Sequence, residues 1–281
     1  MEELIIDMQK KIACINDISG IGKCSLTVAL PIISALKCQC CPLTTSVLSS
    51  QTGYPKYTFS DLTNSMEDYI QVWQDLSIEF DTIYSGFLGS GRQIKIVEKF
   101  INMNKDAFVI VDPVLADLGS IFPIFNHDDV NEMKKLVSIA DLITPNITEA
   151  NLLTSRKPDF FEYNDDSLVD LCKSLSKIGP KYVIITGFEQ DGKIFNICYD
   201  SNLDSISKVG TEYNKISFSG TGDTFTSIVA GMITRGFSIE DSVKCATNFI
   251  YEAVNFTVKQ ENFDRNDGIL FEYFLDKLTN I

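Results

Sequence analysis

The sequence predicts an α/β fold with three layers, α/β/α, around a central and mostly parallel sheet with antiparallel edge strands. Short apolar, β-branched runs alternate with longer segments of helical period, which is typical of βαβ units. The run at residues 182–185 is apolar throughout, as expected for a strand that is buried on both faces. Most of these runs end in a polar turn, and ligands of such sheets bind beyond the carboxyl ends of the strands.

The predicted elements follow one another in a regular order. Strands are predicted at residues 12–15, 42–48, 82–85, 108–111, 142–144 and 182–186. Helices are predicted between them, at residues 22–36, 66–76, 92–102, 128–138 and 167–177. The pattern then changes to antiparallel edge strands at residues 195–199 and 205–211, followed by helices at residues 221–235, 239–259 and 270–278. Because no linker or repeat interrupts this order, we expect one domain over residues 1–281.

Composition narrows the classes of function. The 281 residues are 44% hydrophobic and carry a formal net charge of −14, so a large core can form. Such an acidic chain is a poor partner for nucleic acid or an anionic membrane. No apolar run reaches the roughly 18 residues that span a bilayer, and residues 1–11 lack a basic-then-apolar leader pattern. These observations predict a cytoplasmic protein.

The cysteines and the single histidine indicate no metal centre. Only Cys38, Cys40 and Cys41 cluster, and their spacing matches no zinc site. Buried, reduced thiols are the simpler interpretation. His127 lies in a polar stretch, which predicts a surface position.

The segment at residues 219–225 carries the strongest chemical signal. Gly220 and Gly222 let the backbone turn before a predicted helix, whose first N–H groups can bind an anion. Asp223 lies inside this anion site and could accept a proton from a hydroxyl group that attacks a phosphate. The helix N-terminus is expected to keep Asp223 ionised at neutral pH. The alternative is an ordinary glycine turn, because Asp is favoured at helix starts.

The turn after the first strand is not a P-loop. Gly22 and Lys23 resemble the end of that motif, but Asp17 stands where it needs a glycine and Cys24 where it needs Ser or Thr. It remains a polar strand-to-helix turn at a position that suits a small ligand.

Chemistry-bearing residues also follow the later strands. They are Asp112 with Asp117, Thr144 with Glu149, and Thr186 with Gly187. Carboxylates at one sheet edge suit Mg²⁺, held directly or through water, and a hydroxyl beside bare backbone suits phosphate. The alternative for Glu149 is charge complementarity with a helix N-terminus.

Taken in order, these motifs resemble the ribokinase-like superfamily of small-molecule kinases and, within it, the pyridoxal/pyridoxamine/pyridoxine kinase family. The resemblance runs from residue 12 to about residue 235. The motifs are Asn16-Asp17-Ile18-Ser19-Gly20, Ser49-Ser50-Gln51-Thr52-Gly53-Tyr54, Ser85-Gly86-Phe87-Leu88-Gly89, Asp112-Pro113-Val114-Leu115-Ala116-Asp117, Thr144-Pro145-Asn146-Ile147-Thr148-Glu149 and Gly220-Thr221-Gly222-Asp223.

The resemblance implies an ATP-dependent kinase that phosphorylates the 5′-hydroxymethyl group of vitamin B6, with Mg²⁺ as cofactor, K⁺ as a further candidate, and a homodimeric assembly. It implies that Asp223 is the catalytic base and that the anion hole is formed by Gly220, Thr221 and Gly222. The substrate-binding residues implied are Ser19, Gln51, Thr52 and Phe87. The nucleotide-binding residues implied are Asp112, Asn146, Glu149, Thr186, Gly187 and Gly222. The metal-binding residues implied are Asp117, Thr144 and Glu149.

The sequence departs from the family at two positions in the substrate pocket. Gln51 stands where the family often has His, and Phe87 where many members have Tyr. The nearest alternative is a hydroxymethylpyrimidine kinase of thiamin synthesis, which phosphorylates a similar small ring. A sugar kinase is a weaker alternative, because no set of residues that would bind sugar hydroxyls is found near the N-terminus. A non-catalytic nucleotide-binding protein is also weaker, because it would not need Asp223. Residues 49–61 and 117–126 are predicted as loops that close over the substrate.

Overall fold

The computed structural model describes residues 9–281. The first eight residues of the predicted domain, with most of the segment that lacks a leader pattern, lie outside the described residues. The expectation of one domain over residues 1–281 stays a prediction.

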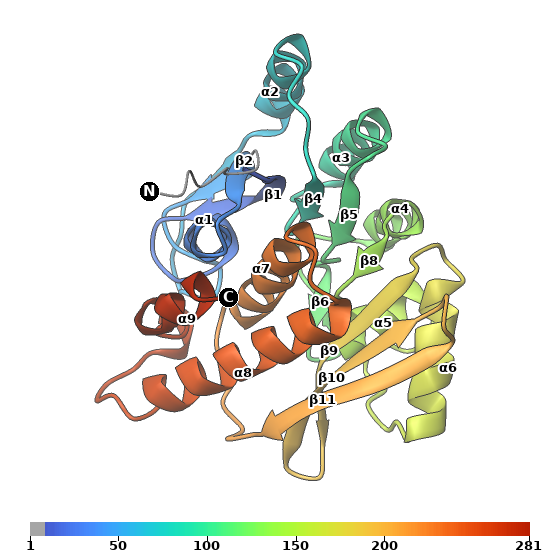
Figure 1. Cartoon of the computed structure of the whole chain (residues 1–281), viewed down its shortest axis with the longest axis vertical. Helices are drawn as coiled ribbons and strands as arrows, with labels where there is room; N and C mark the ends of the chain where they lie inside the picture. The colour runs from blue at the N-terminus through green and yellow to red at the C-terminus, as the bar shows by residue number, and fades with distance from the viewer. Residues whose placement is uncertain (1–8) are drawn as a thin grey trace, which may run out of the picture.

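The centre of the molecule is a nine-stranded sheet in the order β11-β10-β9-β8-β5-β4-β1-β2-β3 (Figure 1). Strands β9, β8, β5, β4, β1 and β2 pair in parallel, while β3 at one edge and β10 with β11 at the other pair antiparallel. The predicted three-layer α/β fold is confirmed. The strands of this sheet are β1 (Lys11–Ser19), β2 (Gln39–Leu48), β3 (Phe59–Asp61), β4 (Thr82–Ser85), β5 (Phe108–Val111), β8 (Leu142–Ile143), β9 (Tyr182–Gln190), β10 (Lys193–Asp200) and β11 (Ser205–Glu212). A separate hairpin joins β6 (Ala116–Asp117) and β7 (Ser120–Ile121).

Helices cover both faces of the sheet, α2 to α6 on one face and α1, α7, α8 and α9 on the other (Figure 1). They are α1 (Ser25–Ala35), α2 (Thr63–Asp75), α3 (Gly91–Met103), α4 (His127–Ser138), α5 (Ile147–Leu153), α6 (Asp165–Ser176), α7 (Thr221–Thr234), α8 (Ile239–Thr257) and α9 (Leu275–Thr279), with 3₁₀ turns η1 (Arg265–Asp267) and η2 (Phe271–Phe274). A core lies on each side because successive strand side chains point to opposite faces. Ala13 and Ile15 enter one core, and Ile12 and Cys14 the other.

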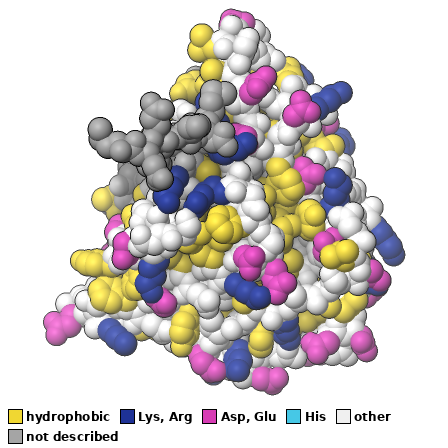
Figure 2. Space-filling model, in the orientation of Figure 1, with side chains coloured by type: hydrophobic (Ala, Val, Ile, Leu, Met, Phe, Trp, Pro, Cys, Tyr) yellow, Lys and Arg dark blue, Asp and Glu magenta, His cyan; other side chains and the backbone are white. Residues whose placement is uncertain are grey.

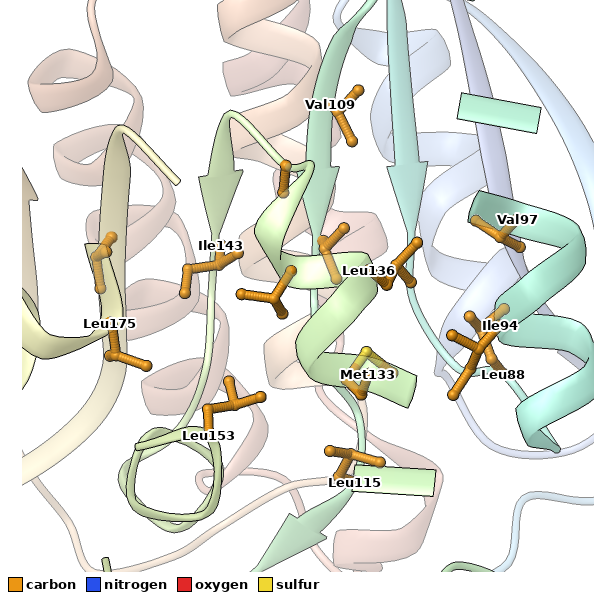
Figure 3. Packing of buried hydrophobic residues seen from close by; sticks show 14 of the residues in the cluster. Leu88, Ile94, Val97, Val109, Leu115, Met133, Leu136, Ile143, Leu153 and Leu175 are labelled. Carbon is orange, nitrogen blue, oxygen red and sulfur yellow. The ribbon is translucent and has the colours of Figure 1, made fainter. Parts of the chain in front are cut away.

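The core beneath α3 to α6 supports the ends of the strands that carry polar residues. Figure 3 shows Leu115, which follows β5, near Met133 of α4, and Ile143 of β8 above Leu153 of α5. These side chains are essentially excluded from solvent, and burying each contributes roughly 1.5–3 kcal/mol. The turns after β5 and β8 are therefore held in place by packing against this core.

Several predicted boundaries need correction. The predicted helix at residues 22–36 begins only at Ser25, because Gly22 has a φ of +93° and Cys24, the N-cap, is extended with a φ of −150°, both outside the helical region. The predicted helix at residues 270–278 is split into η2 and α9. The segments at residues 49–61 and 117–126 are not wholly loops, since the first contains β3 and the second part of the β6–β7 hairpin.

The surface agrees with the acidic composition. Figure 2 shows Asp and Glu side chains interspersed with Lys and Arg on the face in view. His127 is exposed at the start of α4, as predicted. All eight cysteines are free thiols, of which Cys14, Cys38, Cys172 and Cys198 are buried and the others are partly exposed. Within residues 9–281, no helix has the length and apolar character that crossing a membrane requires.

Candidate active site

The glycine-rich turn is built around Gly220. Gly220 has a φ of +76°, and a Cβ there would lie 1.8 Å from the carbonyl oxygen of Lys23. The turn is therefore seated against the segment that precedes α1, and only glycine fits. Gly222 differs, because it has open space where a side chain would begin. Both glycines are predicted to shape the turn. Gly220 does so through its positive φ and its close contact with Lys23, whereas Gly222 leaves the space in front of the N-terminus of α7 free of a side chain.

The start of α7 presents unpaired donors to this open space. The first N–H groups of an α-helix have no acceptor within the helix. Those of Thr221, Gly222 and Asp223 donate to no other residue in the described part of the chain, whereas Thr224 N–H donates to the Gly220 carbonyl at 2.9 Å. The Thr221 hydroxyl donates to the Phe218 carbonyl at 3.1 Å and so stays on the protein. The geometry is that of an anion site formed by backbone groups.

Asp223 is held at this site by Asn16. The Asn16 Nδ2 atom donates to Asp223 Oδ1 at 3.2 Å, while Asn16 Oδ1 accepts from Phe87 N–H at 2.9 Å and from Asp17 N–H at 3.0 Å. Asn16 is fully buried, and a Cβ on Gly86 would lie 2.3 Å from its Nδ2. Asn16 is thus a positioning residue to which the sequence motif alone assigns no role. Its signal in the sequence is an amide side chain directly after the apolar run at residues 12–15 of β1.

Burial raises the pKa of Asp223 to about 6, and the charge of Asp17 adds to this shift. Hydrogen bonds from the Ser25 backbone and Asn16 act in the opposite direction. The sequence predicts that the helix N-terminus dominates, but desolvation of the carboxylate is the larger effect. Asp223 remains mostly ionised at pH 7, and its pKa lies near the operating pH that suits a general base.

A second carboxylate, Asp17, lies near Asp223. Asp17 is buried and accepts hydrogen bonds from the hydroxyls of Ser19, at 3.2 Å, and Ser25. Burial raises the pKa of Asp17 as well. Ser19, predicted to bind substrate, is itself buried and directs its hydroxyl to Asp17. The sequence indicates no separate role for Asp17 or Ser25.

Asp112 is connected to α7 by hydroxyl groups. The Thr226 hydroxyl donates to Asp112 Oδ2 at 3.3 Å, and the hydroxyls of Thr226 and Thr144 are 3.1 Å apart. Burial, with the nearby charge of Asp223, raises the pKa of Asp112 to about 8. The structure therefore brings Asp112 and Thr144 to the same place as Asp223, as the strand-end argument predicts.

Asn146 and Glu149 form a capping box at the start of α5. Asn146 Oδ1 accepts from Glu149 N–H at 2.9 Å, and Glu149 Oε2 accepts from Asn146 N–H at 2.9 Å. Glu149 Oε1 also accepts from Leu115 N–H at 3.1 Å, and Asn146 Nδ2 donates to the Ala116 carbonyl at 2.8 Å. Glu149 therefore interacts with the N-terminus of α5, as the alternative interpretation of this residue expects. Burial raises the pKa of Glu149 well above its usual range.

The residues implied as metal ligands are not grouped around one point. Asp117 is exposed at the end of β6, where its carboxylate accepts from Leu118 N–H at 2.8 Å. Thr144 and Glu149 are buried. Among residues 9–281 there is no group of three His, Cys, Asp or Glu side chains placed to hold a metal ion. Mg²⁺ commonly takes only one or two carboxylates together with substrate phosphates, so this donor set still fits a metal that arrives with a nucleotide.

Thr186, Gly187 and Gly222 line one cavity of about 180 Å³. The cavity lies between β9 and β10 on one side and α7 and α8 on the other, with Ile194, Phe225, Ile250 and Val254 among its walls. It is mainly apolar, and Thr221 and Gly222 at the start of α7 form part of its lining. A flat apolar ring could lie in it, with an attached anion reaching the Gly222 N–H.

The other residues predicted to bind substrate lie in different settings. Gln51 is 8% exposed, whereas Thr52 is exposed and Phe87 is partly buried. The Phe87 ring packs against Phe125, with ring centroids 6.1 Å apart. The Gln51 side chain is hydrogen-bonded within the protein, to Ser219 among other residues.

The buried carboxyl groups make stability depend on pH. Because burial raises the pKa values of Asp17, Asp112 and Glu149, the folded protein holds these protons more tightly than the unfolded chain does. The stability that they contribute below about pH 4 is lost as pH rises through the folded pKa, which for Asp112 is about 8. Urea denaturation should therefore show the free energy of unfolding falling from pH 5 to pH 8, with Asp112 contributing up to roughly 1.4 kcal/mol per pH unit.

The variant Asp112→Asn tests this assignment, because it removes one titrating group and keeps a hydrogen-bond acceptor. Its stability should depend less on pH and exceed that of the unsubstituted protein at pH 8. Stability that rises between pH 5 and pH 8 in both proteins would contradict the assignment.

Comparisons with known proteins converge on one family. The profile of the phosphomethylpyrimidine kinase family matches residues 30–268. The hydroxymethylpyrimidine/phosphomethylpyrimidine kinase of Haemophilus influenzae is 30% identical over 60% of this chain and 63% of its own length. The pyridoxine kinase of Bacillus subtilis is 25% identical over 68% of each chain. The sequence matches thus extend over about two thirds of these relatives.

Solved structures match along the whole described fold. A proposed phosphomethylpyrimidine kinase of Bacteroides thetaiotaomicron VPI-5482 superposes with a TM-score of 0.94 and 40% identity, covering 98% of this chain and 96% of that one. A second crystal form of that protein, with pyridoxal, has a TM-score of 0.92 and 40% identity over 96% of each chain.

Proposed function

Because this chain belongs to the phosphomethylpyrimidine kinase family of ribokinase-like kinases, we propose that it transfers a phosphoryl group from ATP to the 5′-hydroxymethyl group of a vitamin B6 compound. The observation that carries the chemistry is Asp223, a carboxylate with a pKa near 6 beside the unpaired N–H groups at the start of α7. Support for the B6 ring comes from the 40% identical Bacteroides protein, which has a crystal form with pyridoxal.

In the proposed reaction, Asp223 accepts the proton of the hydroxymethyl group. The freed oxygen forms a bond to the γ-phosphorus of ATP as the bond from that phosphorus to the β–γ bridging oxygen breaks, and ADP leaves with the electron pair. Asn16 holds the Asp223 carboxylate by its 3.2 Å hydrogen bond during this transfer. Such positioned general bases contribute typically 10²- to 10⁴-fold to rate.

The backbone N–H groups of Gly220, Thr221 and Gly222 are assigned to the negative charge of the transferred group. They are fixed by the seat of Gly220 against Lys23, so they need not reorganise during the reaction. Positioning and charge stabilisation are the main requirements of phosphoryl transfer.

The nucleotide is assigned to the cavity lined by Thr186, Gly187 and Gly222. Its apolar walls suit the base, and the phosphates can reach the anion site because Thr221 and Gly222 belong to both the cavity and the start of α7. Asp112, Asn146, Thr144, Asp117 and Glu149 are assigned to the phosphate side, where a bound Mg²⁺ would neutralise phosphate charge. Because Asn146 and Glu149 are engaged with each other, they can act there by fixing the β6 backbone.

Hydroxymethylpyrimidine is the alternative acceptor, because the matching family profile and the 30% identical Haemophilus relative carry that name. ATP consumption with Mg²⁺ should be measured with pyridoxal, pyridoxamine, pyridoxine and hydroxymethylpyrimidine, one at a time. We expect the highest kcat/KM with a B6 compound, and a product that carries one added phosphoryl group. Turnover with hydroxymethylpyrimidine alone would favour the alternative, and turnover with none would reject both.

Three further expectations stay predictions for this chain: assembly as a homodimer, activation by K⁺, and location in the cytoplasm. Closure of residues 49–61 and 117–126 over the substrate is likewise a prediction.

A further inference from the structure

We propose that a turn far from the recognised motifs, residues 264–268, positions the acceptor side of the active site, and that Gln51 is a positioning residue and does not read the substrate ring. This 264–268 turn contains η1 and joins α8 to the C-terminal segment. It fixes the acceptor loop, defined as residues 51–54, against the glycine-rich turn. The inference rests on the proposed function for its kinetic consequences and on contacts within the protein for its geometry.

The Gln51 side chain makes its hydrogen bonds within the protein. Its Nε2 atom donates to Ser219 Oγ at 3.2 Å and to the Asn266 carbonyl at 3.2 Å, and its Oε1 atom accepts from Gly53 N–H at 2.6 Å. A side-chain amide has two donor hydrogens, so no donor is left for a ligand. Gln51 therefore links the acceptor loop to Ser219, the residue before Gly220.

Tyr54 makes the second link between the acceptor loop and the 264–268 turn. Its hydroxyl donates to Asp267 Oδ1. This hydrogen bond raises the pKa of Tyr54 to about 12, so the phenol keeps its proton at neutral pH. Hydrogen bonds to carboxylates are stronger than those between neutral groups.

The same turn also holds the two other segments of the site through backbone bonds. Lys23 N–H donates to the Asp267 carbonyl at 3.1 Å, and Ser219 N–H donates to the Arg265 carbonyl at 3.1 Å. Residues 264–268 are thus the common partner of the acceptor loop, the segment before α1 and the glycine-rich turn.

Glycines mark this junction as closely packed. A Cβ on Gly22 would lie 2.5 Å from Gln51 Cγ and 3.1 Å from the Asn266 carbonyl oxygen, and one on Gly53 would lie 2.7 Å from Asn266 Oδ1. Gly268 has a φ of +81°, and its Cβ would lie 2.9 Å from Lys23 Cβ. The loop cannot shift relative to the turn without breaking these contacts.

Loss of these contacts should weaken binding of the acceptor and spare binding of the nucleotide. The acceptor loop follows β2 and bonds to the segment that follows β1. The nucleotide cavity is lined from β9, β10, β11, α7 and α8, and no residue of the acceptor loop or of the 264–268 turn belongs to its lining. Releasing the loop should therefore misplace the hydroxymethyl group relative to Asp223 and leave nucleotide binding intact.

The test uses Tyr54→Phe, Asp267→Ala and the double variant, with Tyr57→Phe as a control on an exposed tyrosine nearby. In each single variant the KM of pyridoxal should rise about tenfold, the loss expected for one charge-assisted bond, while the KM of ATP changes less than about twofold. The double variant should resemble the single ones, because both remove one interaction. An unchanged KM for pyridoxal, an equal rise in the KM of ATP, or additive effects would overturn the proposal.

Hydrogen exchange separates this proposal from the proposed function. Gln51 N–H donates to the Ile21 carbonyl at 2.9 Å and Tyr54 N–H to the Gln51 carbonyl at 3.1 Å, so both report on the acceptor loop. Both should exchange faster in Tyr54→Phe than in Tyr57→Phe. If the unsubstituted protein phosphorylates no acceptor, the proposed function fails, and the role of the 264–268 turn is then tested by hydrogen exchange alone. Equal exchange rates in Tyr54→Phe and Tyr57→Phe would overturn that role.

Discussion

Replacing Asp223 with asparagine is expected to lower kcat by about 10²- to 10⁴-fold, the usual contribution of a general base. The asparagine side chain would keep the size and the hydrogen-bond acceptor that Asn16 contacts, but it cannot accept a proton. ATP should bind with an affinity within a few-fold of that of the unsubstituted protein, because the nucleotide cavity does not include this side chain. Initial rates and equilibrium binding of ATP measure the two quantities.

The control for Asp223→Asn is Asp75→Asn, which removes an exposed carboxylate at the end of α2. It should leave kcat unchanged. A kcat for Asp223→Asn close to that of the control would mean that another group takes the proton.

Replacing Gly220 with alanine is expected to abolish the anion site and to destabilise the fold. The methyl group would lie 1.8 Å from the Lys23 carbonyl oxygen, on a backbone with φ of +76°. Either the glycine-rich turn or the segment before α1 must move, and the N–H groups at the start of α7 move with it. Losing one such donor costs about 10²- to 10³-fold in kcat, so we expect at least that loss.

Gly192→Ala separates the clash from the backbone strain. Gly192 has the same φ of +76° but nothing within 4 Å of its Cβ position. This variant should lose about 1–2 kcal/mol of folding stability, from the left-handed conformation alone, and keep its activity. The Gly220→Ala variant should lose more stability than that, as well as activity. Equal losses of stability in the two variants would show that the contact with Lys23 is not tight.

The parts of the fold that local sequence determines could be predicted. Strand β5 is a continuous apolar run, and β4 is a short buried run with β-branched and aromatic residues. The predicted bounds of both strands are those of the structure. Strand β3 is exposed along its length and pairs only over residues 59–61, so no apolar pattern marks it. The predicted start of α1 is too early because the extended backbone of Cys24, which caps the helix, has no sequence signal.

The site could be predicted where its residues follow strands, and not where they meet over long distances. Asp112, Thr144 and Asp223 come together as the strand-end argument requires. The bond between Asn16 and Asp223 joins residues 207 positions apart, and that between Gln51 and Asn266 joins residues 215 positions apart. Such contacts depend on how the helices return to the sheet, which the local sequence does not specify.

The pH dependence of kcat/KM for pyridoxal tests most directly whether Asp223 is the base. This ratio reports the free protein, in which the pKa of Asp223 is about 6. The base works only when ionised, so kcat/KM should be level above about pH 7 and fall about tenfold per pH unit well below pH 6. In Asp223→Asn the residual activity should lack this fall. The same fall in both proteins would contradict the account.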